Sequence, residues 1–428
     1  MTHVPSDLVL DIQHNPSADY TRLPRPRGRS GGPPTEEGQQ ALDLVVSLRR
    51  HDRDKLHISA YRPGERTPRT RGHRAYLEIS ASLLLRKAAR LRAVWRDRLV
   101  RYYTTDDRGL SASYPFADTV DVSSLASIAT QLTDELAEEG RYLLDEMFAG
   151  QAADLSMFRD YLTEVLAEPG PLRISFDSDL HLPWAMLAVT SSDEDPWTDF
   201  LGHRHQIEQT GAAYPSVRSE YAARNKPVTS LNTDDALEAV GRAPEVRKLL
   251  EIRSELTVRT ESAGLLEALS RAVLDEDVMY FWCHGQFVDN DSRYEQLAVR
   301  LSDDRNIDAD LVRMGRRRHM GAPDAKFRPF VLLNACHTGQ SAAAELDHLG
   351  RALIELGADG VLGPQIEIPQ RFAAEYAFAF LDLYLTGQWT AGEITWQLVR
   401  RFASEYHNPL ALTYSLHCGI DSFLKLAP

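Results

Sequence analysis

Two polar motifs come at the ends of apolar runs that are typical of buried strands. His284 and Gly285 follow 278–283, and Cys336 follows 330–334 after one alanine. A thiol with a pKa of about 8.5 is mostly protonated at neutral pH, and a neighbouring imidazole can take its proton and stabilise the thiolate. The imidazole can then protonate a leaving amine. We therefore predict that His284 and Cys336 form the catalytic pair of a cysteine endopeptidase.

The residues around this pair suggest how an oxyanion would be stabilised. A tetrahedral intermediate needs N–H donors directed at its negative oxygen. Gly285 permits close approach of the backbone, and the N–H of Cys336 supplies a second donor. Gly339 allows the chain to turn into a helix predicted over 341–356, whose N-terminus favours an anionic sulfur. We predict that the N–H groups of Gly285 and Cys336 form the oxyanion site.

These residues must be positioned by the elements that alternate along the chain after position 123. Apolar periodicity predicts helices over 124–148, 155–168, 233–251, 262–274, 341–356, 369–386 and 390–405, with strands over 172–176, 256–259, 278–283, 330–334, 360–363 and 411–418. Thr390 and Glu393 form a capping-box pattern, and 190–230 reads as surface loops. The alternation predicts an α/β fold of three layers, with a mainly parallel sheet between helices. His284 and Cys336 are expected at the carboxyl edge of that sheet, where they can face each other.

The first 122 residues have a different composition. Pro, Gly and Arg recur over 25–34 and 61–72, which predicts loops. Short strands are predicted at 9–12 and 75–79, a short helix at 41–48 and a longer helix at 82–103. We predict a smaller N-terminal α+β region over 1–122 that serves regulation or docking, and a peptidase domain over 123–428. Deleting the first region is expected to change activation and to leave the catalytic pair intact.

The helix predicted over 82–103 is strongly basic. Its basic residues are Arg86, Lys87, Arg90, Arg92, Arg96, Arg98 and Arg101, against a single Asp97. A helix face exposed to water is the simplest interpretation, because most charge runs are solvated. A surface that binds a regulator or nucleic acid is the alternative.

The composition is that of a globular protein in a reducing compartment. Of the 428 residues, 43% are hydrophobic, and 48 basic against 62 acidic side chains leave a net charge of −14, which argues against overall affinity for nucleic acid or anionic membranes. Three cysteines are too few for a disulfide framework. There is no signal peptide pattern and no apolar run of about 20 residues. We predict a cytoplasmic protein that does not associate with membranes.

From about Leu125 onward the sequence resembles a CHAT domain, a caspase-like peptidase family related to separase. The pair His284-Gly285 and the motif Ala335–Gly339 carry the resemblance. His284 precedes Cys336 by 52 positions, close to the spacing of about 50 in caspases. Further matches are 179–184 with the family's L-x-x-P-W signature, 297–303 with its hairpin and 349–361 with the helix and strand after the cysteine. The resemblance implies a caspase-like fold, a His–Cys dyad and a protein substrate.

The chain departs from the family pattern in the region that sets specificity. After Val361 the family commonly has a Trp and, four residues later, an Asp, whereas this chain has Ile366 and Gln370. Asn334 stands two residues before Cys336 in place of any acidic residue, which weakens the case for Arg or Lys at the cleaved position. The candidate substrate-binding residues are Asp179, Trp184, His337, Ile366 and Gln370. Relatives often act in bacterial immunity or programmed death, so an activating partner and an effector substrate, such as a pore-forming protein, are expected.

The other reactive residues have simpler interpretations. Cys283 must point away from the side of the strand that carries His284, which predicts a core residue, and Cys418 is read in the same way. Three adjacent Cys–His pairs raise the question of zinc, but neighbouring strand residues diverge, so we predict no metal and no cofactor. P-loop, G-x-S-x-G and H-E-x-x-H motifs are absent from the sequence. A caspase-like scaffold without proteolytic turnover remains the alternative function.

Overall fold

The structure is a computed structural model. It describes residues 41–52, 54–63, 73–105, 112–190, 195–211, 223–288, 296–303, 305–319, 326–337 and 346–427. The strand predicted at 9–12 lies outside these ranges.

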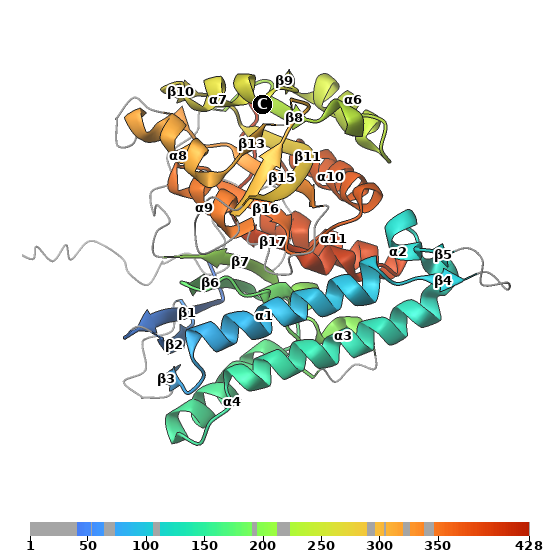
Figure 1. The fold of residues 1–428 in the computed structure, drawn as a ribbon. Coiled ribbons are helices and arrows are strands. Elements are labelled where there is room, and N and C mark those ends of the chain that lie inside the picture. The colour runs from blue at the N-terminus through green and yellow to red at the C-terminus, as the bar shows by residue number, and fades with distance from the viewer. Residues whose placement is uncertain are drawn as a thin grey trace, which may run out of the picture. The chain divides into compact units, whose positions relative to one another are not determined.

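A large mixed sheet forms the centre of the described chain (Figure 1). Its strands, in spatial order, are β13, β12, β11, β15, β16, β17, β7, β6, β1, β2 and β3, with β8 also pairing with β11, and β9 with β8. Their bounds are β1 (Leu44–His51), β2 (Lys55–Tyr61), β3 (Arg74–Leu77), β6 (Arg173–Ser178), β7 (Gln206–Thr210), β8 (Val228–Thr233), β9 (Glu255–Arg259), β11 (Val278–Val288), β12 (Gln296–Arg300), β13 (Asn306–Ile307), β15 (Phe330–His337), β16 (Gly360–Pro364) and β17 (Tyr414–His417). Two small ladders pair β4 (Thr104–Thr105) with β5 (Ala112–Ser113) and β10 (Val273–Leu274) with β14 (Lys326–Phe327).

Helices cover both faces of this sheet. They are α1 (Ala81–Trp95), α2 (Pro115–Asp118), α3 (Ala126–Met147), α4 (Ala153–Ala167), α5 (Leu201–Arg204), α6 (Ala243–Arg253), α7 (Ser262–Leu269), α8 (Ala309–Arg316), α9 (Leu346–Glu355), α10 (Gln370–Tyr384) and α11 (Ala391–Tyr406). Alternate residues of β11 enter two separate cores: Tyr280 and Trp282 pack in the core that includes α10, and Met279 and Phe281 in the core that includes α7. The predicted three-layer α/β architecture with a mainly parallel sheet is confirmed.

The sheet reverses direction in its middle, between β16 and β17. Strands β8, β11, β15 and β16 run parallel to one another. Strand β17 is antiparallel to β16, and β7, β6 and β1 run parallel to β17. The carboxyl ends of β11 and β15 therefore lie at one edge of the sheet, while those of β6 and β1 lie at the opposite edge.

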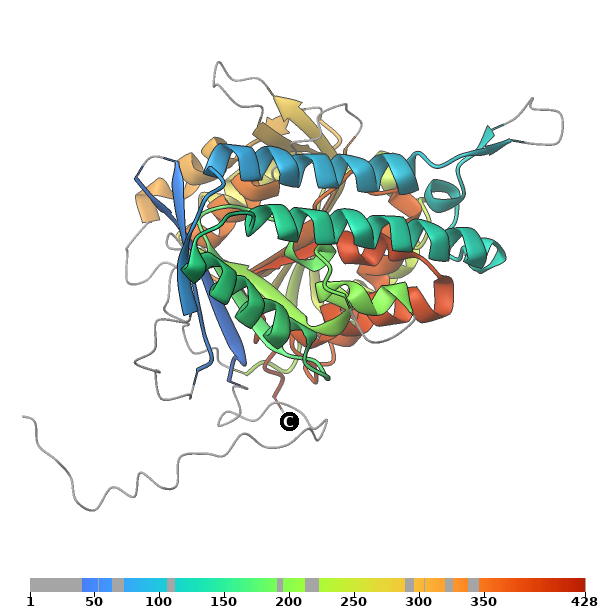
Figure 2. The same cartoon turned by 90° about the horizontal axis from the view of Figure 1, so that it is seen from below.

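Residues before position 122 contribute to the same sheet. Strand β1 pairs in parallel with β6 over Leu44 to Leu48, and α1 lies along α3 (Figure 2). Leu84, Leu91 and Trp95 of α1 are buried in the core that α3 shares. Packing and strand pairing thus cross the boundary that was predicted after residue 122.

Basic side chains of α1 and of the helical turn after it, Arg96–Val100, form ion pairs with acidic side chains of α3. The ion pairs are Lys87–Glu146 (3.2 Å), Arg90–Glu139 (3.2 Å) and Arg98–Glu135 (3.6 Å). Arg92 instead donates hydrogen bonds to Gln365 Oε1 (3.0 Å) and the carbonyl of His181 (2.9 Å). These contacts give the basic run a role inside the fold, so its charge no longer argues for nucleic acid binding.

Most predicted elements are found within a few residues, and the Thr390–Glu393 capping box is confirmed. Some predictions are wrong. The segment predicted as a helix at 41–48 lies largely in strand β1, because its backbone pairs with β2 and β6. The helix predicted at 233–251 begins only at Ala243, and it is preceded by β8.

The loop region predicted at 190–230 contains β7 and the start of β8. The sequence of β8, VTSLNT, is too polar to read as a buried strand, yet Thr229, Ser230 and Asn232 are fully buried. Their side chains are satisfied by partners elsewhere in the chain, among them the carboxylate of Glu276 for Ser230 and the hydroxyl of Ser254 for Thr229.

Candidate active site

The two predicted catalytic residues occupy neighbouring parallel strands. In the register of β11 and β15, His284 is paired with Cys336 and Gly285 with His337. Both strands extend beyond their predicted ends, so these residues lie within the ladder instead of just after it. The backbone therefore brings His284 and Cys336 directly opposite each other, while the side chains of Cys336 and His337 lie outside the described part.

The imidazole of His284 contacts a carboxylate that the sequence analysis did not identify. Its Nε2 lies 3.4 Å from Oδ2 of Asp234, and the two side chains are 21% and 13% exposed. Asp234 directly follows β8, which pairs with β11 in parallel. An acidic residue at the carboxyl end of a neighbouring strand is the sequence feature that could have identified Asp234. Strand β8 was not recognised from the sequence because it is polar.

The two cysteines outside the predicted pair have distinct surroundings. Cys283 is fully buried and packs with Met279 and Phe281 in the core, as predicted. Cys418 is half-buried just after β17 and has a left-handed backbone with φ of 55°, and its N–H donates to Gln209 O at 2.9 Å. Within the described ranges, no three His, Cys, Asp or Glu side chains are grouped as metal ligands would be.

The predicted oxyanion donors both belong to strand backbone. Gly285 is in register with Val299 of β12 on one side and with His337 of β15 on the other. The role of the Gly285 and Cys336 N–H groups stays a prediction.

A cleft of about 540 Å³ opens beside the loops that follow β8 and β16. Its lining includes Val240 and Gly241 after β8, and Glu367 and Gln370 after β16. Burial raises the pKa of Glu367 above its ordinary value, although the nearby charges of Arg101 and Arg96 oppose this. The loop that carries Asp234 therefore continues into one wall of this cleft.

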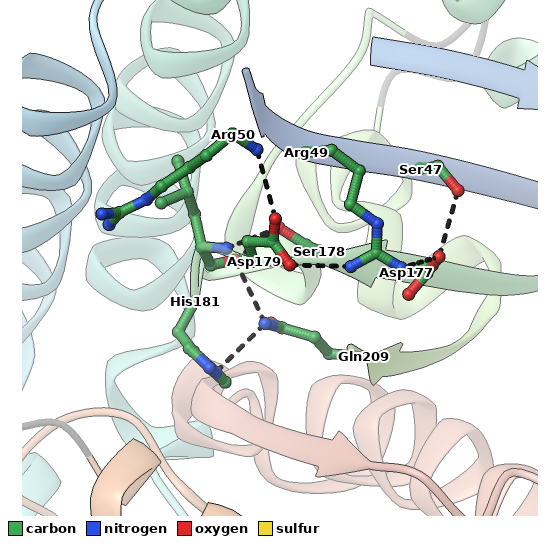
Figure 3. Close-up of polar contacts among 9 residues, drawn as sticks. Ser47, Arg49, Arg50, Asp177, Ser178, Asp179, His181 and Gln209 are labelled. Atoms are coloured by element: carbon green, nitrogen blue, oxygen red, sulfur yellow. Dashed lines mark hydrogen bonds and ion pairs between the residues drawn. The ribbon is translucent and has the colours of Figure 1, made fainter. Parts of the chain in front are cut away.

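Of the candidate substrate-binding residues, Gln370 lines the cleft, whereas Ile366 is 8% exposed and packs in the core. Asp179 lies at the opposite edge of the sheet from His284, because it follows β6 beyond the reversal of strand direction. There it accepts hydrogen bonds from the Arg49 side chain (2.8 Å) and the Arg50 N–H (3.2 Å), as Figure 3 shows. The structure does not bring Asp179 to the site.

Trp184 is a core residue in the structure. It is 3% exposed, and its ring stacks on Phe176 with centroids 3.9 Å apart. The nearby His181 accepts a hydrogen bond at its Nδ1 from Gln209 Nε2 at 3.1 Å (Figure 3).

Asn334, two residues before Cys336, is fully buried and hydrogen-bonded to two other elements. Its Nδ2 donates to Ala373 O of α10 (2.9 Å), and its Oδ1 accepts from the hydroxyl of Tyr414 (2.9 Å). Both polar atoms of this amide are thus used to tie β15 to α10 and β17.

The family model of the CHAT domain matches residues 129–393, more than half of the chain. A probable protease of Vitiosangium sp. is 30% identical over 138 residues, which cover 32% of this chain and 17% of that protein. This chain therefore aligns with less than a fifth of the length of that relative.

Two crystal structures of the separase–securin complex of Saccharomyces cerevisiae share a weak similarity. The TM-scores are 0.43 and 0.44 at 10% and 9% sequence identity, and the similarity covers 88% of this chain and 30% of the matched chain in both cases.

The chain carries an α/β sheet in which a histidine and a cysteine are paired in register on neighbouring strands, which is the architecture of a caspase-like protein. It belongs to the CHAT domain family.

None of the helices in the described ranges has both the length and the apolar character that crossing a membrane requires.

Proposed function

We propose that this protein is a cysteine endopeptidase in which His284 activates the thiol of Cys336. The observation that carries the proposal is the register of β11 and β15, which pairs these two residues across neighbouring strands. Membership of a caspase-like peptidase family supports it. A histidine beside a cysteine at this position has the chemistry that thiol activation requires.

The reaction proceeds by covalent catalysis. His284 takes the proton of the Cys336 thiol, and the thiolate attacks the carbonyl carbon of the scissile peptide bond, forming a C–S bond. The C–N bond then breaks as His284 gives the proton to the leaving amine. Water, deprotonated by His284, hydrolyses the thioester and restores the thiol. In this proposal the N–H groups of Gly285 and Cys336 hold the oxyanion.

The cleft beside the loops after β8 and β16 is the candidate site for the substrate chain. Its lining combines polar and charged residues, Glu367, Gln370 and Arg371, with apolar ones such as Val100 and Val240, as ligand-binding clefts commonly do. Gln370 and His337 are retained as candidate contacts. We expect the substrate to be a protein of the same cytoplasmic compartment.

The family resemblance also suggests a biological setting. We propose activation by a partner or signal in bacterial defence or programmed death, with an effector such as a pore-forming protein as the substrate.

The proposal is tested with Cys336→Ala, with Cys418→Ala as the matched control. We expect Cys336→Ala to abolish cleavage of a peptide library, measured by mass spectrometry, because no nucleophile remains. Cys418→Ala should keep full activity. A peptide with a thiol-reactive warhead should label the wild-type protein at Cys336.

Full cleavage by the Cys336→Ala variant would exclude the proposed nucleophile. A wild-type protein that neither cleaves the library nor reacts with the warhead would favour the scaffold function without turnover.

A further inference from the structure

We propose that Asp234 is a third functional residue of this site, which orients His284 and stabilises its charged form. The inference rests on the proposed peptidase function. It starts from the 3.4 Å contact between Asp234 Oδ2 and His284 Nε2, made between two largely buried side chains.

The backbone of Asp234 is fixed relative to His284. Strands β8 and β11 are paired up to Thr233 and Trp282, and the N–H of Asp234 donates to Trp282 O at 3.1 Å. The parallel ladder therefore continues one residue past β8. As a result, Asp234 is held by the same strand that carries His284 two residues later.

The other carboxylate oxygen of Asp234 is also held in place. Its Oδ1 accepts hydrogen bonds from the N–H of Ala236 (2.9 Å) and the hydroxyl of Ser302 (3.4 Å). Ser302 in turn accepts from the N–H of Asp235 (2.9 Å), and its own N–H donates to Thr260 O (2.9 Å). With Oδ1 occupied by these partners, Oδ2 is left for His284.

This geometry defines what each imidazole nitrogen does. A carboxylate at Nε2 selects the tautomer in which Nε2 carries the proton. Nδ1 is then the nitrogen that can exchange a proton with the thiol. After proton transfer the imidazolium is positive, and the adjacent carboxylate favours it, which also favours the thiolate. Asp234 is a positioning residue because it acts through His284.

A purely structural role for Asp234 is the competing explanation, since its Oδ1 caps the short helical turn that starts at Asp235. Asparagine distinguishes the two roles. It caps helical turns as well as aspartate does, and it has nearly the same shape, but it lacks the charge. Asp235 provides the matched control, because it is exposed in the same turn and contacts Ser302 through its backbone N–H, which Asp235→Asn keeps.

The experiment compares Asp234→Asn, Asp234→Glu and Asp235→Asn in the full chain. Two readouts are measured: kcat and KM on a peptide that the wild type cleaves, and the rate at which iodoacetamide alkylates Cys336, located by mass spectrometry. We expect Asp234→Asn to lower kcat by about 10- to 100-fold, with KM within about twofold, and to slow alkylation. Asp234→Glu should restore part of kcat, and Asp235→Asn should match the wild type in both readouts.

The role of Asp234 is overturned if Asp234→Asn keeps wild-type kcat, or if Asp235→Asn loses as much activity. It is also overturned if both rates fall together with the melting temperature, since that indicates a structural role. A wild-type protein that is inert in both readouts would instead overturn the peptidase function, and the role of Asp234 within it.

Discussion

At the scale of a single residue, His205 shows how burial determines the protonation state of a titratable group. The side chain is 1% exposed; its Nδ1 accepts a hydrogen bond from Leu172 N–H (3.1 Å), and its Nε2 faces Leu166 O at 3.0 Å. Accepting at one nitrogen and donating at the other is possible only for a neutral ring. Burial lowers the pKa of His205 to about 4.

This histidine should make the fold sensitive to mild acid. As the pH falls from about 6.5 to 4, the unfolded chain binds a proton at His205 before the folded chain does, so stability decreases. The shift corresponds to roughly 3 kcal/mol at the acidic end. In urea unfolding, His205→Gln should be less stable than the wild type at pH 7, and this difference should shrink towards pH 4.5. A difference that stays constant with pH would contradict the buried neutral state.

At the scale of elements, β8 depends on a buried polar network. Glu276, whose side chain is 5% exposed, accepts hydrogen bonds from Ser230 of β8 and forms an ion pair with Arg259 of β9 at 2.5 Å. Arg259 also donates to Asn232 of β8 at 3.3 Å. Since Asp234 directly follows β8, this network also supports the candidate active site.

Removing the cation of this network should be costly. Arg259→Met leaves the buried carboxylate of Glu276 without its charged partner, and we expect a loss of about 3 kcal/mol in the free energy of unfolding. The matched control is Arg247→Met, whose ion pairs with Glu238 and Glu251 are exposed and worth less than about 1 kcal/mol. Equal losses in the two variants, measured by urea denaturation, would show that the buried network does not hold β8.

At the scale of the whole molecule, the segment before residue 122 contributes strands to the same sheet as the rest of the chain. Strand β1 covers the edge of β6, and α1 buries Leu84, Leu91 and Trp95. Edge strands that lose their partner expose unpaired backbone groups and are prone to aggregate.

We therefore expect the fragment 123–428 to be unstable by itself. It should elute as an aggregate in gel filtration and lack a cooperative thermal transition, in contrast to the full chain. A soluble fragment with the melting temperature of the full chain would instead support the separable regulatory region that the composition predicts.

The sequence was sufficient for the local features of this protein. Apolar periodicity located most helices and strands, because each element must bury one or two faces. The motifs around His284 and Cys336 identified the candidate pair and the family, and the side-chain alternation of strands placed Cys283 in the core.

Features that depend on contacts between distant segments were decided only by the tertiary structure. The pairing of β8 with β11 brings Asp234 to His284, and polar β8 is a strand only because its partners satisfy its buried side chains. The reversal between β16 and β17 sends Asp179 to the opposite edge from His284. A hydrophobic pattern indicates which face of an element is buried. The pattern does not indicate which strand lies beside that element or in which direction the neighbouring strand runs.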